Sequence, residues 1–364
     1  MSRRLRMSLG IVAGVVLLAL ALWGVDADEL RRNIAGANAG WLVAAAVLYL
    51  TAYFVRSLRW RAILRPIASV RVSESFHMLM AGYFLNYVIP IRAGEVAKSF
   101  FLKRLKGIPI ATSLPTVFVD KLFELVSILF VVAMVPILSV SMSVTLAALI
   151  YTVLAIFVLA IALLFFAFRN PEGASRLLCG LISWLPKKVY ARLSEFIGLF
   201  VQGMGVARRE ARTLWSFLGL TGLAVLIDGL YFYFMFRAFS VDVAFTRVLF
   251  GYTLLTLSYI LPTPPAQIGY NEFVIGLIFA GGVAAAGMAR HEVMAVIIVA
   301  HALTGLLIAG VGLWSFGAMG IRVGESFRNI TGAYGPGPDG PAEGAASTGE
   351  TTRGRTCSGR SERG

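Results

Sequence analysis

Long apolar segments recur along the chain, and the short stretches between them hold most of the charged residues. A helix of about 20 apolar residues crosses the hydrocarbon core of a bilayer, and its backbone must satisfy its own hydrogen bonds there. The spanning segments predicted on this basis are Met7–Val25, Trp41–Val55, Leu114–Ile137, Val144–Phe168, Leu214–Phe236 and Val293–Met319. The pattern therefore predicts an all-α, polytopic integral membrane protein with about six full spans.

Two further apolar segments contain the residues that interrupt helices. Gly82–Glu95 and Gly251–Glu272 both begin with Gly-Tyr, continue to Tyr-x-x-Pro, and reach a later Gly and a Glu. At membrane depth, Pro and Gly are tolerated where the freed backbone groups are buried in protein or line a cavity. Interrupted segments in corresponding positions of two halves indicate a transporter-like binding site. We therefore predict two broken or re-entrant helix hairpins.

The basic residues predict the orientation, because Lys and Arg concentrate in cytoplasmic loops. One basic cluster precedes the first span, one follows the second, and one follows the first broken segment. Their members are Arg3, Arg4 and Arg6; Arg56, Arg59, Arg61, Arg65 and Arg71; and Arg92, Lys98, Lys103, Arg104 and Lys106. This places both termini in the cytoplasm of a cell-membrane protein. The two hairpins then enter from opposite faces, in an inverted arrangement.

Two organisational units follow from these patterns. Residues 1–324 form the transmembrane domain, and a basic connector at about 169–212 carries one apolar helical face. That connector either lies on the bilayer surface or packs against the spans. Residues 325–364 are rich in Gly, Pro, Ala and Ser, a composition that cannot bury a core, so we expect a disordered cytoplasmic tail.

Composition supports the membrane class and narrows the function. The chain is 58% hydrophobic and 14% charged, whereas a soluble globule carries about 25% charged residues. The net charge of +14 belongs to loops that flank spans and meet anionic lipid, so we expect no nucleic-acid partner. The two cysteines and three histidines form no metal-ligand spacing, and no nucleotide-binding or catalytic motif is present. We expect neither a metal nor a cofactor.

Four charged residues lie inside predicted spans. Asp120 and Glu124 are four residues apart, and Lys121 is three residues from Glu124, so these side chains are neighbours on one helix. Each charge at a helix centre costs about 2.5–3.5 kcal/mol on insertion scales, so the groups must face an interior, a partner or water. Asp228 has no basic neighbour in its own span and is expected to meet Lys121 or an arginine across the bundle. Structural ion pairing and a role in substrate or proton binding both remain open.

The helix breaks supply the other residues of the predicted binding or translocation path. At the first break these are Asn86, Arg92, Gly94, Glu95 and Lys98; at the second they are Tyr259, Pro262, Gln267, Gly269, Asn271 and Glu272. A restarting helix exposes N–H groups that favour anions such as phosphate. The alternatives are that the basic residues are ordinary cytoplasmic anchors and that Glu272 only caps its helix. His77 and His301 are expected to be satisfied interior groups rather than ligands.

At these residues the chain resembles the transmembrane flippase-like domain of lysylphosphatidylglycerol synthases and its stand-alone relatives. The matching pieces are Arg56-x-x-Arg59-Trp60, Asn86–Glu95, Asp120-Lys121 with Glu124, and the Pro-rich segment that ends Gly269-Tyr270-Asn271-Glu272. The family's second break is closer to Pro-Gly-Gly-x-Gly-x-x-Glu, and the segment from Pro264 to Gly269 departs from it.

The resemblance implies two re-entrant helix pairs and movement of a phospholipid or lipid-linked head group between leaflets. The expected partners are membrane lipids: an anionic or aminoacylated phospholipid, or a polyprenyl-phosphate lipid. Homo-oligomerisation stays open. Aminoacyl transfer is not expected, because a tail follows the membrane part instead of the aminoacyltransferase domain. The alternatives are an enzyme or enzyme partner acting on a polyprenyl-phosphate glycolipid, with Asp120 or Glu95 as base or metal-binding carboxylate, and a structural membrane subunit.

Overall fold

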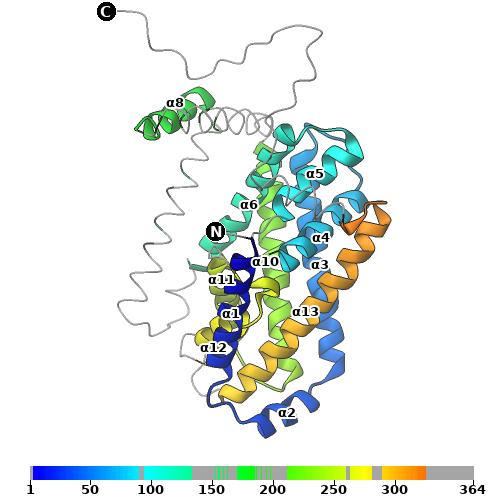
Figure 1. Cartoon of the computed structure of the whole chain (residues 1–364), viewed down its shortest axis with the longest axis vertical. Helices are drawn as coiled ribbons and strands as arrows, with labels where there is room; N and C mark the ends of the chain where they lie inside the picture. The colour runs from blue at the N-terminus through cyan, green and yellow to red at the C-terminus, as the bar shows by residue number, and fades with distance from the viewer. Residues whose placement is uncertain are drawn as a thin grey trace, which may run out of the picture.

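Helices make up all the regular secondary structure that the computed structural model describes (Figure 1). The described residues are 3–89, 94–132, 170–184, 211–259, 263–280 and 289–324, with single positions at 152, 155, 159, 162, 186, 190, 194 and 197. The all-α prediction is confirmed for this part of the chain. Most of the predicted span Val144–Phe168, most of the connector, the tail, Arg92 and Pro262 lie outside the described residues.

Three long helices form the frame of the bundle: α3 (Ala39–Leu64), α10 (Ala211–Ala238) and α13 (Arg290–Ala318). Each contains a segment that is long and apolar enough to cross a membrane. Helices α3 and α10 are antiparallel neighbours, because the Asn38 N–H at the start of α3 donates to the Ala238 carbonyl at the end of α10, at 2.8 Å. The membrane class predicted from hydropathy is confirmed, and six remains a predicted number of spans.

At the chain's start, α1 (Arg3–Leu22) and α2 (Ala27–Ala35) meet at a bend of 91°. Asp26 caps α2 by accepting hydrogen bonds from the N–H groups of Asp28 and Glu29. Together the two helices could form a fourth, broken span. Helix α2 lies beside the start of α13, where His291 Nδ1 is 2.7 Å from Glu29 Oε2.

Helix α3 is longer than hydropathy predicts. We placed Arg56 and Arg59 in a loop after Val55, but the helix continues to Leu64 and both side chains point into the protein. Arg59 is only 1% exposed. Each arginine has a carboxylate partner within the bundle, which allows a cation to remain in the protein interior. The prediction that these two residues are loop anchors is wrong.

The first broken segment forms a hairpin of α4 (Val72–Val88) and α5 (Gly94–Lys106), and α6 (Ile110–Val132) follows. The open base of this hairpin is closed by Lys106 Nζ, which lies 2.9 Å from Glu74 Oε2. Lys98, which the sequence predicts as a path residue with a cytoplasmic anchor as the alternative, is fully buried inside α5. Helix α8 (Pro171–Leu181) lies in the connector region.

The second broken segment forms a hairpin of α11 (Phe245–Ser258), the 3₁₀ turn η2 (Pro265–Gln267) and α12 (Tyr270–Phe279). It begins six residues after α10 ends, at the end of the bundle where α3 starts. The α4–α5 hairpin instead begins where α3 ends. The two hairpins therefore enter the bundle from opposite ends (Figure 1).

The glycine of each Gly-Tyr pair lies where the two arms of its hairpin meet. A Cβ on Gly94 would come within 1.9 Å of the Gly82 carbonyl, so α4 and α5 touch through their backbones. In the other hairpin, a Cβ on Gly251 would meet the Phe279 ring at 2.4 Å. Small residues at these two contacts allow the arms to pack closely.

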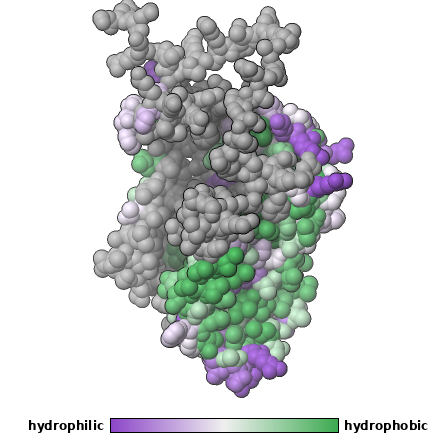
Figure 2. Space-filling model, in the orientation of Figure 1, coloured by the Kyte–Doolittle hydropathy of each residue, from purple (hydrophilic) through white to green (hydrophobic). Residues whose placement is uncertain are grey.

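The surface pattern fits a bundle that sits in a bilayer. Figure 2 shows hydrophobic residues over much of the lower half of the face in view, with hydrophilic residues at the bottom tip and at the upper right. Several large apolar side chains are exposed on the framing helices, including Val43, Val47, Leu223, Leu226, Leu306 and Trp314. In water such exposure would be unfavourable, whereas lipid accommodates it.

Candidate functional site

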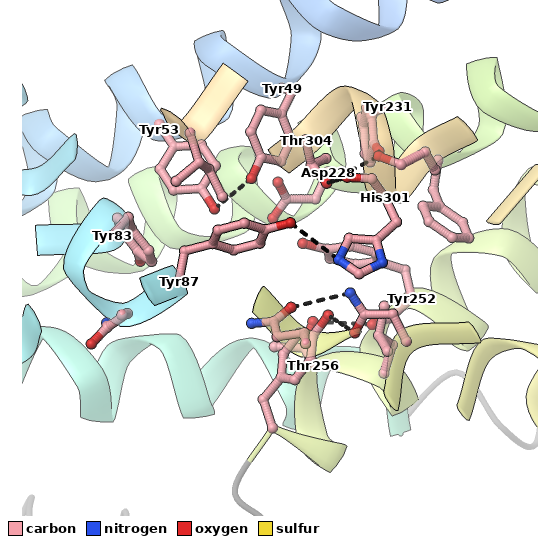
Figure 3. A pocket seen from close by; sticks show the side chains of 18 of the residues that line it. Tyr49, Tyr53, Tyr83, Tyr87, Asp228, Tyr231, Tyr252, Thr256, His301 and Thr304 are labelled. Carbon is pink, nitrogen blue, oxygen red and sulfur yellow. Dashed lines mark hydrogen bonds between the residues drawn. The ribbon is translucent and has the colours of Figure 1, made fainter. Parts of the chain in front are cut away.

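A cavity of about 330 Å³ lies between the two hairpins. Helices α3, α4, α5, α6, α10, α11, α12 and α13 and the turn η2 all contribute to its wall. Seven tyrosines line it (Figure 3): Tyr49, Tyr53, Tyr83, Tyr87, Tyr231, Tyr252 and Tyr259. Tyr83 and Tyr252 each follow the glycine of the repeated motif, so both copies of the motif present a tyrosine to the cavity.

Arg56 and Asp228 form a two-pronged ion pair in the cavity wall. Arg56 Nη1 donates to Asp228 Oδ1 at 3.2 Å, and Nη2 donates to Oδ2. The guanidinium carbon of Arg56 lies 5.1 Å from the centre of the Tyr53 ring, within cation–π range. The expectation that Asp228 meets Lys121 or an arginine across the bundle is confirmed, and the partner is Arg56.

Lys121 connects the first hairpin to α6. Its Nζ lies 2.9 Å from Glu95 Oε1 and 2.6 Å from Glu124 Oε2. Glu95 also accepts from Asn86 Nδ2 at 3.2 Å, and Glu124 accepts from the Tyr83 hydroxyl at 3.2 Å. Asn86 Oδ1 in turn accepts from the Gly94 N–H at 2.8 Å, at the N-terminus of α5. The helix restart is thus capped within its own hairpin.

A second layer of charges lies behind these residues. Arg59 donates from Nε to Asp120 Oδ1 at 2.8 Å, and its Nη2 is 3.3 Å from Glu124 Oε1. Lys98 Nζ lies 2.8 Å from Glu95 Oε2 and 3.9 Å from Asp120 Oδ2. Neither Arg59 nor Lys98 lines the cavity, and both are buried with Asp120.

The two layers are balanced in charge. Four cations (Arg56, Arg59, Lys98, Lys121) face four carboxylates (Glu95, Asp120, Glu124, Asp228). Removing one partner of a buried pair costs about 3–5 kcal/mol, because a charge is left uncompensated. Arg56 and Lys121, the two cations that line the cavity, thus already have carboxylate partners.

His301 links the two hairpins from α13. Its Nδ1 is 2.5 Å from Glu272 Oε1 and its Nε2 is 2.8 Å from the Ala266 carbonyl, both in the second hairpin. The Tyr87 hydroxyl of the first hairpin lies 3.3 Å from Nε2 (Figure 3). The two ring nitrogens thus face a carboxylate and a carbonyl, both of which accept hydrogen bonds.

Glu272 has the capping role that we left open, together with this contact to His301. Its Oε2 accepts from the Gly269 N–H at 2.8 Å, at the start of α12. The turn before it is strained, because Ala266 and Gln267 have φ values of 52° and 59°. Such left-handed conformations cost about 1–3 kcal/mol for a residue other than glycine.

The predicted path residues divide into three groups. Asn86, Glu95, Lys121, Glu124, Asp228, Tyr259, Gln267 and Asn271 line the cavity. Gly94, Lys98 and Glu272 contact lining residues from behind, while Asp120 and Gly269 contact other residues behind the cavity, namely Arg59, Lys98 and Glu272. Arg92 and Pro262 lie outside the described residues. The structure thus brings together residues from both breaks and both charged spans.

Sequence reasoning missed several lining residues, chiefly Tyr49, Tyr53, Arg56, Tyr87, Thr256, His301 and Thr304. Tyr49, Tyr53 and Arg56 follow one another at spacings of four and three residues, which places them on one face of α3. That spacing was the available signal. His301 was expected to be a satisfied interior group, and it is paired, but it also faces the cavity. Among the described residues, no group of three or more His, Cys, Asp and Glu side chains is placed to hold a metal ion.

The family described as "Lysylphosphatidylglycerol synthase TM region" matches residues 7–312. The chain belongs to this family. The match covers every residue that lines the cavity, and the resemblance inferred from the motifs is confirmed. No solved structure matches the chain.

Relatives of the chain include archaeal membrane proteins. One named "UPF0104 membrane protein", from Methanothermobacter thermautotrophicus, is 27% identical over 73% of this chain and 80% of its own length. Another of that name, from the same organism, is 22% identical over 88% of this chain and 97% of its own. "Glycosyltransferase AglD" of Haloferax volcanii is 28% identical over 35% of this chain; the aligned region spans about a fifth (20%) of the glycosyltransferase.

Proposed function

We propose that this protein binds the polar head group of a membrane lipid in the cavity between the two hairpins and moves it between leaflets. The observation that carries the proposal is the cavity itself, which is lined by ion pairs, amides and seven tyrosines inside a bundle with an apolar exterior. Charged groups at membrane depth mark substrate pathways when they face a cavity. Two interrupted hairpins that meet at such a cavity form the geometry of a transporter site.

The size and composition of the cavity suit a head group. About 330 Å³ is at the small end of ligand pockets, which measure about 300–1,000 Å³. A head group fits within it, while the lipid chains stay in the surrounding bilayer. The cavity therefore supplies a polar route for the part of a lipid that the hydrocarbon core excludes.

In the proposed mechanism, the lipid phosphate binds to the cations of the ion pairs that line the cavity. The sequence predicts Arg92 and Lys98 as the cations of the path at the first break, but Lys98 is buried behind the cavity, and Arg92 is outside the described residues. The cations that line the cavity are Arg56 and Lys121. In this mechanism the phosphate exchanges with Asp228 at Arg56, or with Glu95 and Glu124 at Lys121. Each cation then keeps a partner throughout, and no uncompensated charge forms.

The membrane arrangement in this proposal keeps the orientation that the loop charges predict. The hairpins are re-entrant, the base of α4–α5 faces the cytoplasm, and the base of α11–α12 faces the outside of a cell membrane. Both termini are cytoplasmic, and a span at Val144–Phe168 completes the six. Because no nucleotide-binding motif is present, movement is downhill or coupled to an ion.

A lipid-linked glycan is a second candidate for the transported lipid, and one comparison favours it. One relative is named a glycosyltransferase, and it aligns over a third of this chain. In this version the protein binds a polyprenyl-phosphate glycolipid, either to translocate it or as the partner of an enzyme that uses it. Of the two carboxylates first considered as a base, only Glu95 lines the cavity, since Asp120 is held behind it by Arg59.

Leaflet exchange in reconstituted vesicles tests the proposal. The probes are fluorescent phosphatidylglycerol, fluorescent phosphatidylethanolamine and a short-chain polyprenyl-phosphate mannose, and protein-free vesicles are the control. We expect the purified protein to accelerate exchange of at least one probe several-fold. If it accelerates none of the three, translocation is not the function of this cavity.

A further inference from the structure

The turn η2 holds two consecutive residues in a conformation that suits glycine. Ala266 and Gln267 have positive φ, and in the described part of the chain only Ser240 shares this feature among residues other than glycine. Two contacts hold the turn: the Gln267 N–H donates to the Pro264 carbonyl at 2.9 Å, and the Ala266 carbonyl faces His301 Nε2 at 2.8 Å. Glycine at either position would adopt the same backbone without strain. At position 267 the chain therefore has a residue with a side chain where glycine would avoid the backbone strain.

That side chain points into the cavity and is oriented by a relay. The Tyr259 hydroxyl donates to Asn271 Oδ1 at 2.9 Å, and Asn271 Nδ2 donates to Gln267 Oε1 at 3.1 Å. The relay occupies the Gln267 oxygen and fixes the orientation of the amide. Within the described residues, the amino group of Gln267 has no hydrogen-bond partner, so it offers two N–H donors to whatever occupies the cavity.

The other lining groups from the same part of the wall are mainly neutral. Thr256 and Thr263 belong to the second hairpin with Gln267 and Asn271, and Thr304 lies one turn after His301 on α13. His301 is paired with Glu272 behind the wall. The unpaired donors of Gln267 therefore match a group that offers oxygen acceptors and do not match a cation.

We propose that Gln267 is a specificity-determining residue that recognises the hydroxyl-bearing part of a head group, either glycerol or a sugar. The inference rests on the proposed function in that it requires a lipid head group in the cavity. A hydroxyl oxygen accepts a hydrogen bond from the Gln267 amide. An ammonium group has only donors, so an amine head group leaves the amide unpaired. Sites built to hydrogen-bond a hydroxyl discriminate strongly in this way.

Lipid binding and thermal unfolding of the detergent-purified full-length protein test this inference. Native mass spectrometry gives relative affinities for phosphatidylglycerol, short-chain polyprenyl-phosphate mannose and phosphatidylethanolamine. Gln267→Gly removes both the amide and the strain, while Ala266→Gly removes strain and leaves the amide. We expect both variants to unfold at a higher temperature than the wild type. Phosphatidylglycerol tests recognition of a glycerol, and polyprenyl-phosphate mannose tests recognition of a sugar. The probe that the wild type binds more tightly shows which of the two head groups Gln267 recognises.

The wild type and Ala266→Gly are expected to bind a hydroxylated probe about tenfold more tightly than phosphatidylethanolamine, which corresponds to about one hydrogen bond. In Gln267→Gly this preference falls to about twofold or less. The inference is overturned if the wild type shows no preference, if Gln267→Gly keeps it, or if Gln267→Gly fails to fold while Ala266→Gly folds. Leaflet exchange of several lipids without any preference would overturn this inference alone. A preference in binding without exchange would overturn only translocation.

Discussion

Arg56 of α3 and Asp228 of α10 face each other across the bundle, and each terminal guanidinium nitrogen donates to a different carboxylate oxygen. Their two helices pack along much of their lengths, and the pair forms part of the cavity wall. The cation that is placed to hold a phosphate is therefore occupied by a carboxylate in this structure. In the proposed mechanism, a lipid enters by exchange of ionic partners, which keeps every charge of the lining compensated.

The buried ion pairs behind the cavity are expected to be essential for stability. Asp120→Asn leaves the buried guanidinium of Arg59 without its main carboxylate, because the two groups are 2.8 Å apart and enclosed. We expect this change to lower the free energy of unfolding by about 3–5 kcal/mol. Denaturant or thermal unfolding in detergent measures it.

Asp242→Asn is the matched control for this change. It removes the carboxylate partner of another arginine, Arg237, but the Asp242 side chain is 89% exposed. Exposed ion pairs are worth about 0–1 kcal/mol, so this variant should unfold like the wild type. Equal effects of the two substitutions would show that burial of the Arg59 pair has no energetic role.

The close contact of α4 and α5 predicts a steric effect at Gly94. A Cβ in Gly94→Ala would lie 1.9 Å from the Gly82 carbonyl, and backbone cannot move aside as a flexible side chain can. We expect a loss of stability of about 1–3 kcal/mol. Gly222→Ala in α10 is the control, because nothing lies within 4 Å of its added Cβ, and it should be neutral or stabilising. A Gly94→Ala protein as stable as Gly222→Ala would contradict the backbone contact.

The inverted hairpins predict the sides from which their bases are accessible. Lys103 is exposed near the end of α5, and Asp242 is exposed just before α11. In a background with Cys179 and Cys357 replaced by serine, we expect Lys103→Cys and Asp242→Cys to react with a membrane-impermeant maleimide from opposite faces. Lys103→Cys should react from the cytoplasmic face. Labelling of both from one face would contradict the inverted arrangement.

Hydropathy predicts much of the fold, because most helices of the bundle are apolar along their whole length, both where they face the protein interior and where they face outward. The predicted segments overlap α1, α3, α6, α10 and α13. The error at the end of α3 has a clear cause. A window of hydropathy treats Arg56 and Arg59 as the start of a loop, whereas their charges are compensated by Asp228 and Asp120 from distant helices. Only the tertiary structure supplies those partners.

The sequence predicts those site residues that are unusual inside an apolar segment, such as charged residues and helix breakers. Carboxylates inside spans and glycines and prolines inside apolar segments pointed to Glu95, Glu124 and Asp228, and all three line the cavity. The lining threonines carry no such signal, because they occur in spans and at interfaces without special cause, and Tyr49 and Tyr53 carry only their helical spacing to Arg56. His301 shows the same limit: its pairing with Glu272 depends on how α13 packs against α12, which spacing along the chain does not determine.

The most direct test of the central claim separates the Arg56–Asp228 pair's role in lipid exchange from its role in stability. Replacing a buried ion pair by apolar residues of similar size is often neutral or stabilising, so Arg56→Met with Asp228→Leu should fold as well as the wild type. The measurement is leaflet exchange of the best wild-type probe in vesicles that hold equal amounts of folded protein. We predict at least about a tenfold lower exchange rate for the double variant, since losing a charged hydrogen bond removes about 1.5–3 kcal/mol. Wild-type exchange by this variant would contradict a lipid route through the cavity that depends on Arg56.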